Sequence, residues 1–126
     1  MLRYLTLGSN DIVRSGRFYD PVLGVLGLGR MKTLGHEIGY GGADGGLTVW
    51  VVKPFDERAA TAGNGSMLAF AAPTRTAVDD FHRQALAHGG SDEGKPGLRP
   101  YGENFYACYV RDPDGNKLSA VCQGPA

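Results

Sequence analysis

The sequence predicts an α+β fold in which one βαβββ module occurs twice in tandem. Two observations lead to this prediction. An apolar strand-like segment, a polar break, an amphipathic helical segment and a glycine stop recur half a chain length apart, so that residues 4–27 align with residues 67–90. Three further strand-like segments follow each copy. This order favours helices packed on one face of antiparallel-rich sheets.

The first module begins with a short apolar strand at residues 2–7. Asn10 or Asp11 can cap the helix that follows, because a short polar side chain accepts hydrogen bonds from free N–H groups in the first turn. Apolar residues keep helical spacing to residue 26, although Pro21 predicts a kink or an early break. The strands expected next are residues 30–34, 37–40 and 47–53.

The second module starts with a strand at residues 66–71. Thr74 is the expected N-cap of a helix over residues 75–88, and two glycines stop it. Its expected buried stripe is Val78, Phe81, His82, Ala85 and Leu86. The remaining strands are residues 91–93, 104–111 and 117–122, the last two joined by a turn over residues 112–116 in which Pro presets φ and Gly supplies a positive φ.

Length and composition favour one domain of residues 1–126, with module one at about 1–55, a linker at about 56–64 and module two at about 65–126. Thirteen basic and thirteen acidic residues cancel, so no net field favours nucleic acid or a membrane as partner. No apolar run approaches the roughly 18 residues of a membrane span. The N-terminus lacks a signal-peptide core, and two cysteines are too few for a disulfide framework, so we expect a cytoplasmic protein.

Several motifs resemble the vicinal oxygen chelate superfamily, which includes glyoxalase I, extradiol dioxygenases and the fosfomycin- and bleomycin-resistance proteins. The motifs are Ser15-x-x-Phe18-Tyr19, then Phe81-His82-x-x-Ala85-Leu86-x-x-Gly89-Gly90, then Gly94-x-Pro96-Gly97-x-Arg99-Pro100, and, as the most specific, Tyr109-Val110-x-Asp112-Pro113-Asp114-Gly115-Asn116-Lys117-Leu118. The resemblance implies that the two modules form a cupped mixed sheet with the helices on its outer face and the active site in the cup. It also implies that the chain can pair as a homodimer.

The resemblance places four potential metal-ligand positions on the first and last strands of the modules, and here they hold Tyr4, Trp50, Met67 and Ser119. A phenol, an indole, a thioether and a neutral hydroxyl are poor ligands for zinc, nickel or magnesium, which need converging His, Asp, Glu or Cys donors. The histidines are expected in structural roles, at a strand turn and on the second helix: His36, His82 and His88. The sequence therefore predicts no metal and no other cofactor.

Strand alternation predicts what lines the cup instead. If Leu5 and Phe70 face the helices, their strand neighbours face the cup, and pairing across the turn at residues 112–116 sets Tyr109 opposite Ser119. The predicted lining is Tyr4, Thr6, Thr48, Trp50, Met67, Phe105, Tyr109 and Ser119. Apolar walls with few polar groups are typical of a small-molecule pocket. The alternative is that these side chains simply fill the cup as core.

Two further features lie near this cup. Residues 95–103 are expected to form a Gly- and Pro-rich loop at its rim, where Arg99 either binds a carboxylate or phosphate or is solvated. Cys108 and Cys122 are expected to face the helices as buried thiols without a catalytic base.

Two functions remain open at this point. In the first, the protein is a binding module that holds a small, partly apolar molecule without a metal. In the second, it is a glyoxalase-like lyase or a dioxygenase that uses a relocated metal, or metal-free chemistry with Tyr4 or Tyr109 as the acid. The sequence does not name the ligand, and it does not decide whether the protein is an enzyme.

Overall fold

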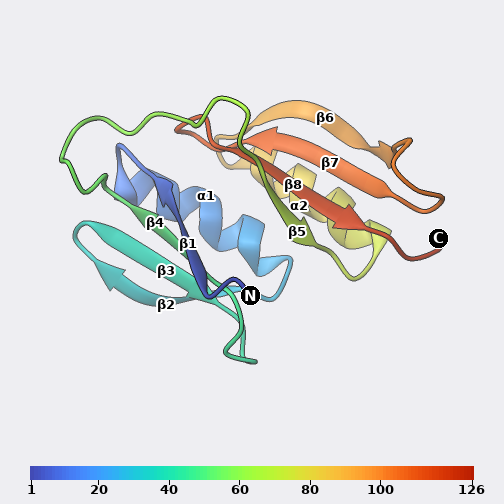
Figure 1. The fold of residues 1–126 in the computed structure, drawn as a ribbon, viewed down its shortest axis with the longest axis horizontal. Helices are drawn as coiled ribbons and strands as arrows, with labels where there is room; N and C mark the ends of the chain where they lie inside the picture. The colour runs from blue at the N-terminus through green and yellow to red at the C-terminus, as the bar shows by residue number, and fades with distance from the viewer.

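The computed structural model describes residues 1–126 as ten elements in the order β-α-β-β-β, twice (Figure 1). The first module consists of β1 (Tyr4–Gly8), α1 (Ile12–Gly24), β2 (Gly29–Leu34), β3 (Glu37–Gly41) and β4 (Thr48–Val52). The second consists of β5 (Leu68–Ala71), α2 (Arg75–Ala87), β6 (Ser91–Leu98), β7 (Tyr106–Arg111) and β8 (Lys117–Cys122). The α+β prediction with two tandem modules is confirmed.

Each module forms its own four-stranded mixed sheet. The strand order is β1-β4-β3-β2 in the N-terminal sheet and β5-β8-β7-β6 in the C-terminal sheet, and no strand of one sheet pairs with a strand of the other. The first and last strands of each module are parallel, and the other pairs are antiparallel. Figure 1 shows both helices behind the strands, where α1 and α2 contact each other.

Residues that alternate toward the helices form one hydrophobic core shared by both modules. Along β4, Val49 and Val51 are fully buried, whereas Thr48, Trp50 and Val52, which alternate with them, are only partly buried. The helices contribute Phe18 and Tyr19 from α1 and Phe81 from α2, all without exposed surface. We call the opposite side of each sheet, which points away from the helices, its open face.

The turn between β7 and β8 joins the two modules through polar contacts, of which the one between Tyr19 and Asp112 is buried. The Tyr19 hydroxyl on α1 donates to the Asp112 carboxylate at 2.5 Å. The next acid of the turn, Asp114, accepts from Arg14 at 2.6 Å and from the Ser15 hydroxyl at 3.2 Å. Asn116 donates to the backbone carbonyl of Gly8 at 3.0 Å. The turn thus binds to the end of β1 and to the first half of α1.

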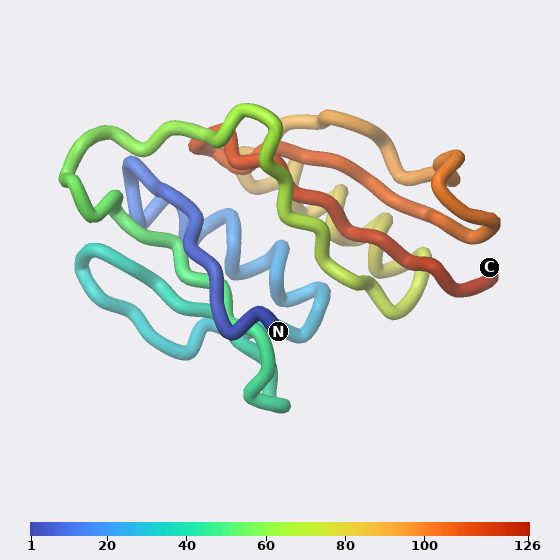
Figure 2. The backbone as a smooth tube through the Cα atoms, in the orientation of Figure 1, coloured from blue at the N-terminus to red at the C-terminus, as the bar shows by residue number.

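The linker is fixed to the first module by one asparagine. Asp11 is the N-cap of α1, and the neighbouring Asn10 instead forms two hydrogen bonds with the backbone of Ala60, at 2.7 and 3.1 Å. Figure 2 shows the linker, drawn in green, running from the N-terminal sheet to the C-terminal sheet. Of the two candidate caps, one therefore caps the helix and the other holds the linker.

Three local predictions are wrong. β6 extends to Leu98, although residues 95–98 were expected in a loop. It is an edge strand with two register shifts, and an edge strand tolerates Pro96 because a proline lacks an N–H group for a second neighbouring strand. The early break considered at Pro21 does not occur: α1 continues to Gly24, and the buried residues that follow Pro21 pack its last turn against the core. Leu86 is 42% exposed, since the buried face of α2 is formed by Ala77, Val78, Phe81 and Ala85.

The sequence predicts no membrane span, and the helices of the structure are α1 and α2. Neither is both long and apolar enough to cross a bilayer.

Two buried tyrosines should make the folded protein less stable at alkaline pH. Burial and a hydrogen bond to Asp112 raise the pKa of Tyr19, and burial with a hydrogen bond to Asp20 raises that of Tyr40. Because the folded protein favours both neutral phenols, their contribution is fully present below the unfolded pKa of about 10 and is lost as pH rises above it. We expect the free energy of unfolding in urea to fall above about pH 10. The fall should be shallower in Tyr40→Phe, whereas an equal slope in that variant would contradict this assignment.

Candidate functional site

The open face of the N-terminal sheet carries four of the predicted site residues. Tyr4 lies opposite Thr48 in the β1–β4 register, and Thr6 lies opposite Trp50. Their neighbours along the strands, among them Val49, pack toward the helices. The alternation rule therefore places the four residues on one face, where Tyr4 is 59% exposed.

Trp50, the only tryptophan of the chain, lies across a glycine of the neighbouring strand. Gly39 is its register partner on β3, and a Cβ atom there would lie 2.6 Å from the Trp50 ring. Gly41, two residues along, similarly makes room for the sulfur of Met31. Only glycine at these positions lets an aromatic ring and a thioether lie flat on the sheet.

Replacing Gly39 with alanine should displace the indole ring. Trp50 is only partly buried, so the ring can turn toward solvent, and we expect a red-shifted fluorescence maximum with a stability loss of about 1 kcal/mol. Gly29→Ala on β2 is the matched control, because a Cβ there meets nothing within 4 Å. An unchanged emission spectrum in Gly39→Ala would show that the ring does not rest on this glycine.

The open face of the C-terminal sheet carries Tyr109 and Ser119, which are register partners as predicted. The Ser119 hydroxyl is fully buried and has no hydrogen-bond partner. Met67 directly precedes β5 and is 46% exposed. Phe105 directly precedes β7, and its ring meets that of Tyr101 edge-on at 5.4 Å.

Arg99 lies on this same face and is not a freely solvated loop residue. A Cβ atom at Gly94 or at Gly97 would lie 3.3 or 3.1 Å from its guanidinium nitrogens, so the group covers both glycines of β6. The guanidinium carbon is 5.3 Å from the centroid of the Tyr109 ring, and the Lys117 ammonium is 5.7 Å from the same centroid. Lys117 was missed by the sequence analysis, although it stands two residues before Ser119 on β8 and so shares its face.

The nine predicted site residues thus form two groups on two sheets. Tyr4, Thr6, Thr48 and Trp50 lie on or beside the N-terminal sheet, and Met67, Arg99, Phe105, Tyr109 and Ser119 lie on or beside the C-terminal sheet. Thr6 lines a cavity at the end of the N-terminal sheet beside residues 52–59, and none of the nine residues lines a second cavity on the helix side. Within one chain, the two groups do not share either of these cavities.

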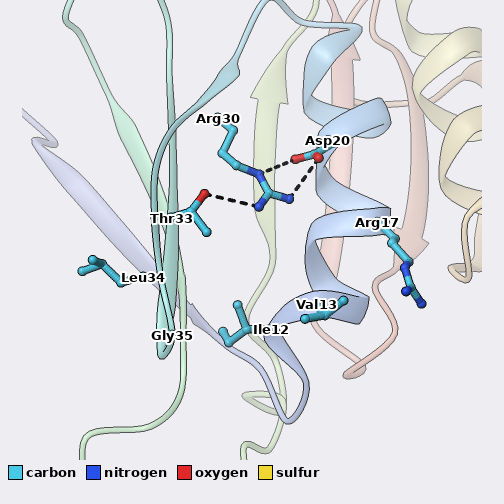
Figure 3. Close-up of a pocket in the computed structure, with 8 residues that line it drawn as sticks. All are labelled: Ile12, Val13, Arg17, Asp20, Arg30, Thr33, Leu34 and Gly35. Carbon is cyan, nitrogen blue, oxygen red and sulfur yellow. Dashed lines mark hydrogen bonds and ion pairs between the residues drawn. The ribbon is translucent and has the colours of Figure 1, made fainter.

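The other of these cavities lies on the helix side, between α1 and β2 (Figure 3). The Arg30 guanidinium donates to both carboxylate oxygens of Asp20, at 2.9 and 3.0 Å. It covers Gly16 of α1, where a Cβ atom would clash with it. Asp20 also accepts from the Tyr40 hydroxyl at 2.6 Å. These contacts join β2 and β3 to α1. The charged residues Asp20 and Arg30 of this cavity therefore have a structural role.

The donor set on the open faces does not fit a divalent metal. No three His, Cys, Asp or Glu side chains come together in the structure as a metal site. Each histidine contacts a nearby group: His82 contacts Asp92 at 2.8 Å, His88 contacts the Gln84 carbonyl at 2.9 Å, and His36 contacts Glu37 at 3.4 Å. The four positions that the resemblance assigns to a metal offer a phenol, an indole, a thioether and a hydroxyl.

The two cysteines lie on the helix side of the C-terminal sheet and not in this site. Both are buried, and the Cys108 thiol donates to the backbone carbonyl of Val78 on α2. Burial raises the Cys108 pKa to about 11. A thiol that stays protonated at neutral pH is a poor nucleophile.

Comparison with known proteins identifies the family of this chain. Residues 2–119 match the family model of the Glyoxalase/Bleomycin resistance protein/Dioxygenase superfamily. The chain belongs to this superfamily. No curated protein matches this member of the superfamily significantly.

Solved structures of the glyoxalase/bleomycin resistance group have the same fold as this superfamily member. A glyoxalase/bleomycin resistance protein from Albidiferax ferrireducens T118 is 37% identical over 98% of this chain and 99% of its own, with a TM-score of 0.90. A glyoxalase-related enzyme from Fulvimarina pelagi is 23% identical over 97% of this chain and 87% of its own, with a TM-score of 0.78. A lactoylglutathione lyase from Agrobacterium tumefaciens is 20% identical over 97% and 92%, with a TM-score of 0.70. The last two establish similarity of fold alone.

Proposed function

We propose that this superfamily member binds a small, partly apolar molecule against the open faces of its sheets, without a divalent metal. The observation behind this proposal is the environment of Trp50. Its ring lies flat on Gly39, remains partly exposed and has the Thr6 position beside it. An accessible aromatic surface with a nearby hydroxyl is suited to an apolar ligand that also forms a hydrogen bond.

The absence of a metal from this proposal rests on donor chemistry. Tyr4 could bind a metal only as a phenolate, and the model value for a tyrosine pKa is near 10. A neutral hydroxyl, a thioether and an indole complete the four positions. The proposed binding therefore depends on shape and on a few hydrogen bonds.

We further propose that the protein works as a cytoplasmic homodimer. Tyr4, Met31 and Met67 expose 59%, 52% and 46% of their surface, and each sheet carries only one group of the predicted lining. A second copy that covers these faces would remove apolar surface from water and enclose the ligand. Sedimentation equilibrium should then give twice the chain mass at micromolar concentration, and monomers throughout would contradict the dimer.

Fluorescence of the single tryptophan provides a direct test of binding. Titration with N-phenylnaphthylamine, a neutral apolar dye, should quench Trp50 emission saturably. Tyr4→Ala and Thr6→Val should weaken binding by about fivefold each, since each loses one contact on this face. Val13→Ala is the control, because the Val13 side chain is exposed to an extent similar to that of Tyr4 but lies on α1, away from the open faces. Equal affinity in all four proteins, or no saturable quenching, would refute the binding site.

The enzymatic alternative has its own test. We expect elemental analysis of protein purified without a histidine tag to find no stoichiometric nickel, zinc, iron or manganese, and no turnover of the methylglyoxal–glutathione adduct. A near-stoichiometric metal that is lost in Tyr4→Phe or Glu37→Gln would replace the binding proposal with a metalloenzyme that uses a relocated site. Robust turnover would replace it with a lyase.

A further inference from the structure

Two cations on the open face of the C-terminal sheet have no carboxylate partner. The Arg99 guanidinium donates only to the backbone carbonyls of Lys95 and Leu98. The Lys117 ammonium forms no hydrogen bond or ion pair and lies 5.7 Å from the centroid of the Tyr109 ring. By contrast, the neighbouring Arg111 is neutralised by Glu93 at 2.7 Å. Arg99 and Lys117 thus place two positive charges without a carboxylate partner beside the Tyr109 ring.

The backbone holds one of these cations in place. Gly94 is the register partner of Tyr109, and Gly97 is that of Ala107, so both glycines belong to the open face. A Cβ atom at Gly94 would lie 2.8 Å from the Tyr109 ring and 3.3 Å from the Arg99 guanidinium, and one at Gly97 would lie 3.1 Å from that guanidinium, so the group packs closely over this part of β6. A guanidinium held in one place loses less conformational entropy on binding an oxyanion than a mobile arginine in solvent would lose.

A buried, unpartnered hydroxyl lies on the same face. Ser119 is the register partner of Tyr109 on the side opposite Gly94, and its Oγ has neither exposed surface nor a hydrogen-bond partner. Leaving such a group unpaired is unfavourable in a folded protein, and it commonly indicates a partner that the protein alone does not supply. Ser119 is thus a third polar residue next to Tyr109, on the strand that also carries Lys117 two residues before it.

We propose that Arg99, Lys117 and Ser119 form an anion subsite that binds the carboxylate or phosphate group of the ligand, with the Tyr109 ring as its apolar wall. This inference rests on the proposed function and specifies the class of ligand as a small organic anion. Guanidinium and ammonium groups both form charge-assisted hydrogen bonds to oxyanions, and a neutral ligand would leave the two cations uncompensated.

Nuclear magnetic resonance can test the subsite in the full chain with defined probes. Inorganic phosphate, benzoate and the neutral isostere benzamide are each titrated at constant ionic strength, and the amides of residues 94, 109 and 119 are followed. We expect saturable shifts with benzoate, with phosphate or with both, and none with benzamide. The responding probe tells a carboxylate ligand from a phosphate ligand. Arg99→Gln and Lys117→Gln should each weaken binding about tenfold, while Arg83→Gln on the exposed side of α2 should not.

Ser119→Ala separates a ligand contact from a structural role. Because the hydroxyl has no partner in the protein, this variant should be at least as stable as the parent without anion, yet bind the responding probe about threefold more weakly. A less stable variant with unchanged affinity would overturn the role of Ser119. Benzamide binding equal to benzoate binding, unaffected by Arg99→Gln or Lys117→Gln, would overturn the anion subsite and leave the small-molecule proposal standing. If neither these probes nor the neutral dye bind, both proposals fail.

Discussion

Asp112→Ala should lower the free energy of unfolding by about 3 kcal/mol or more, because several buried donors lose their acceptor at once. The Asp112 carboxylate accepts from the Tyr19 hydroxyl, from the backbone N–H groups of Asp114 and Asn116, and from the Asn116 side-chain amide. Its side chain is buried, so water cannot replace it at these donors. Urea unfolding followed by circular dichroism measures the effect.

Two further variants show that this loss comes from the contact between the modules. Asp56→Ala is the control, since Asp56 accepts one hydrogen bond from the backbone of Arg58 in an exposed turn and should cost less than about 1 kcal/mol. Combining Asp112→Ala with Tyr19→Phe in a double-mutant cycle should give a coupling of about 1 kcal/mol or more. An Asp112→Ala loss no larger than that of Asp56→Ala would mean that the turn does not stabilise the association of the modules.

Gly90→Ala should lower the free energy of unfolding almost as much, for a steric reason. A Cβ atom there would lie 2.7 Å from the Ala85 carbonyl oxygen, 2.8 Å from the Arg111 carbonyl oxygen and 2.8 Å from the Phe18 ring. Two of these contacts are backbone atoms of α2 and β7, which cannot turn aside as a flexible side chain could. We expect a destabilisation of about 2–4 kcal/mol.

Gly24→Ala provides the matched comparison for this substitution. Gly24 closes α1, and a Cβ there meets nothing within 4 Å, so alanine should leave stability unchanged or raise it by up to about 1 kcal/mol. Thermal melts of the two variants should move in opposite directions or differ severalfold in size. Similar losses in both would attribute the Gly90 effect to glycine replacement in general and not to its packing.

Local signals in the sequence were enough to predict most of the secondary structure. The N-cap at Thr74 and the turn after Asp112 depend on neighbouring residues only, and both are found where expected. Once that turn sets the register, alternation places Tyr109 opposite Ser119 and turns both away from the helices. The same rule would have identified Lys117 as a third polar residue of that face.

Other features could not be derived from the sequence, because they depend on contacts between distant segments. The Gly- and Pro-rich residues 95–98 have the composition of a loop, and only pairing with β7 makes them an edge strand that presents Arg99 on the open face. The predicted lining separates into two groups because the two sheets do not pair with each other, although α1 packs against α2.

The sequence by itself determined a repeated βαβββ module and the alternation of residues along its strands, and it put a phenol, an indole, a thioether and a hydroxyl at Tyr4, Trp50, Met67 and Ser119. These properties follow from side-chain chemistry and from the strand period of two, which act over a few residues. The tertiary structure alone decided that Asp112 binds Tyr19 of the other module, that Arg99 rests on two glycines, and that the Ser119 hydroxyl is left without a partner. Each of these depends on which distant atoms come within hydrogen-bond or van der Waals distance, and packing sets those distances.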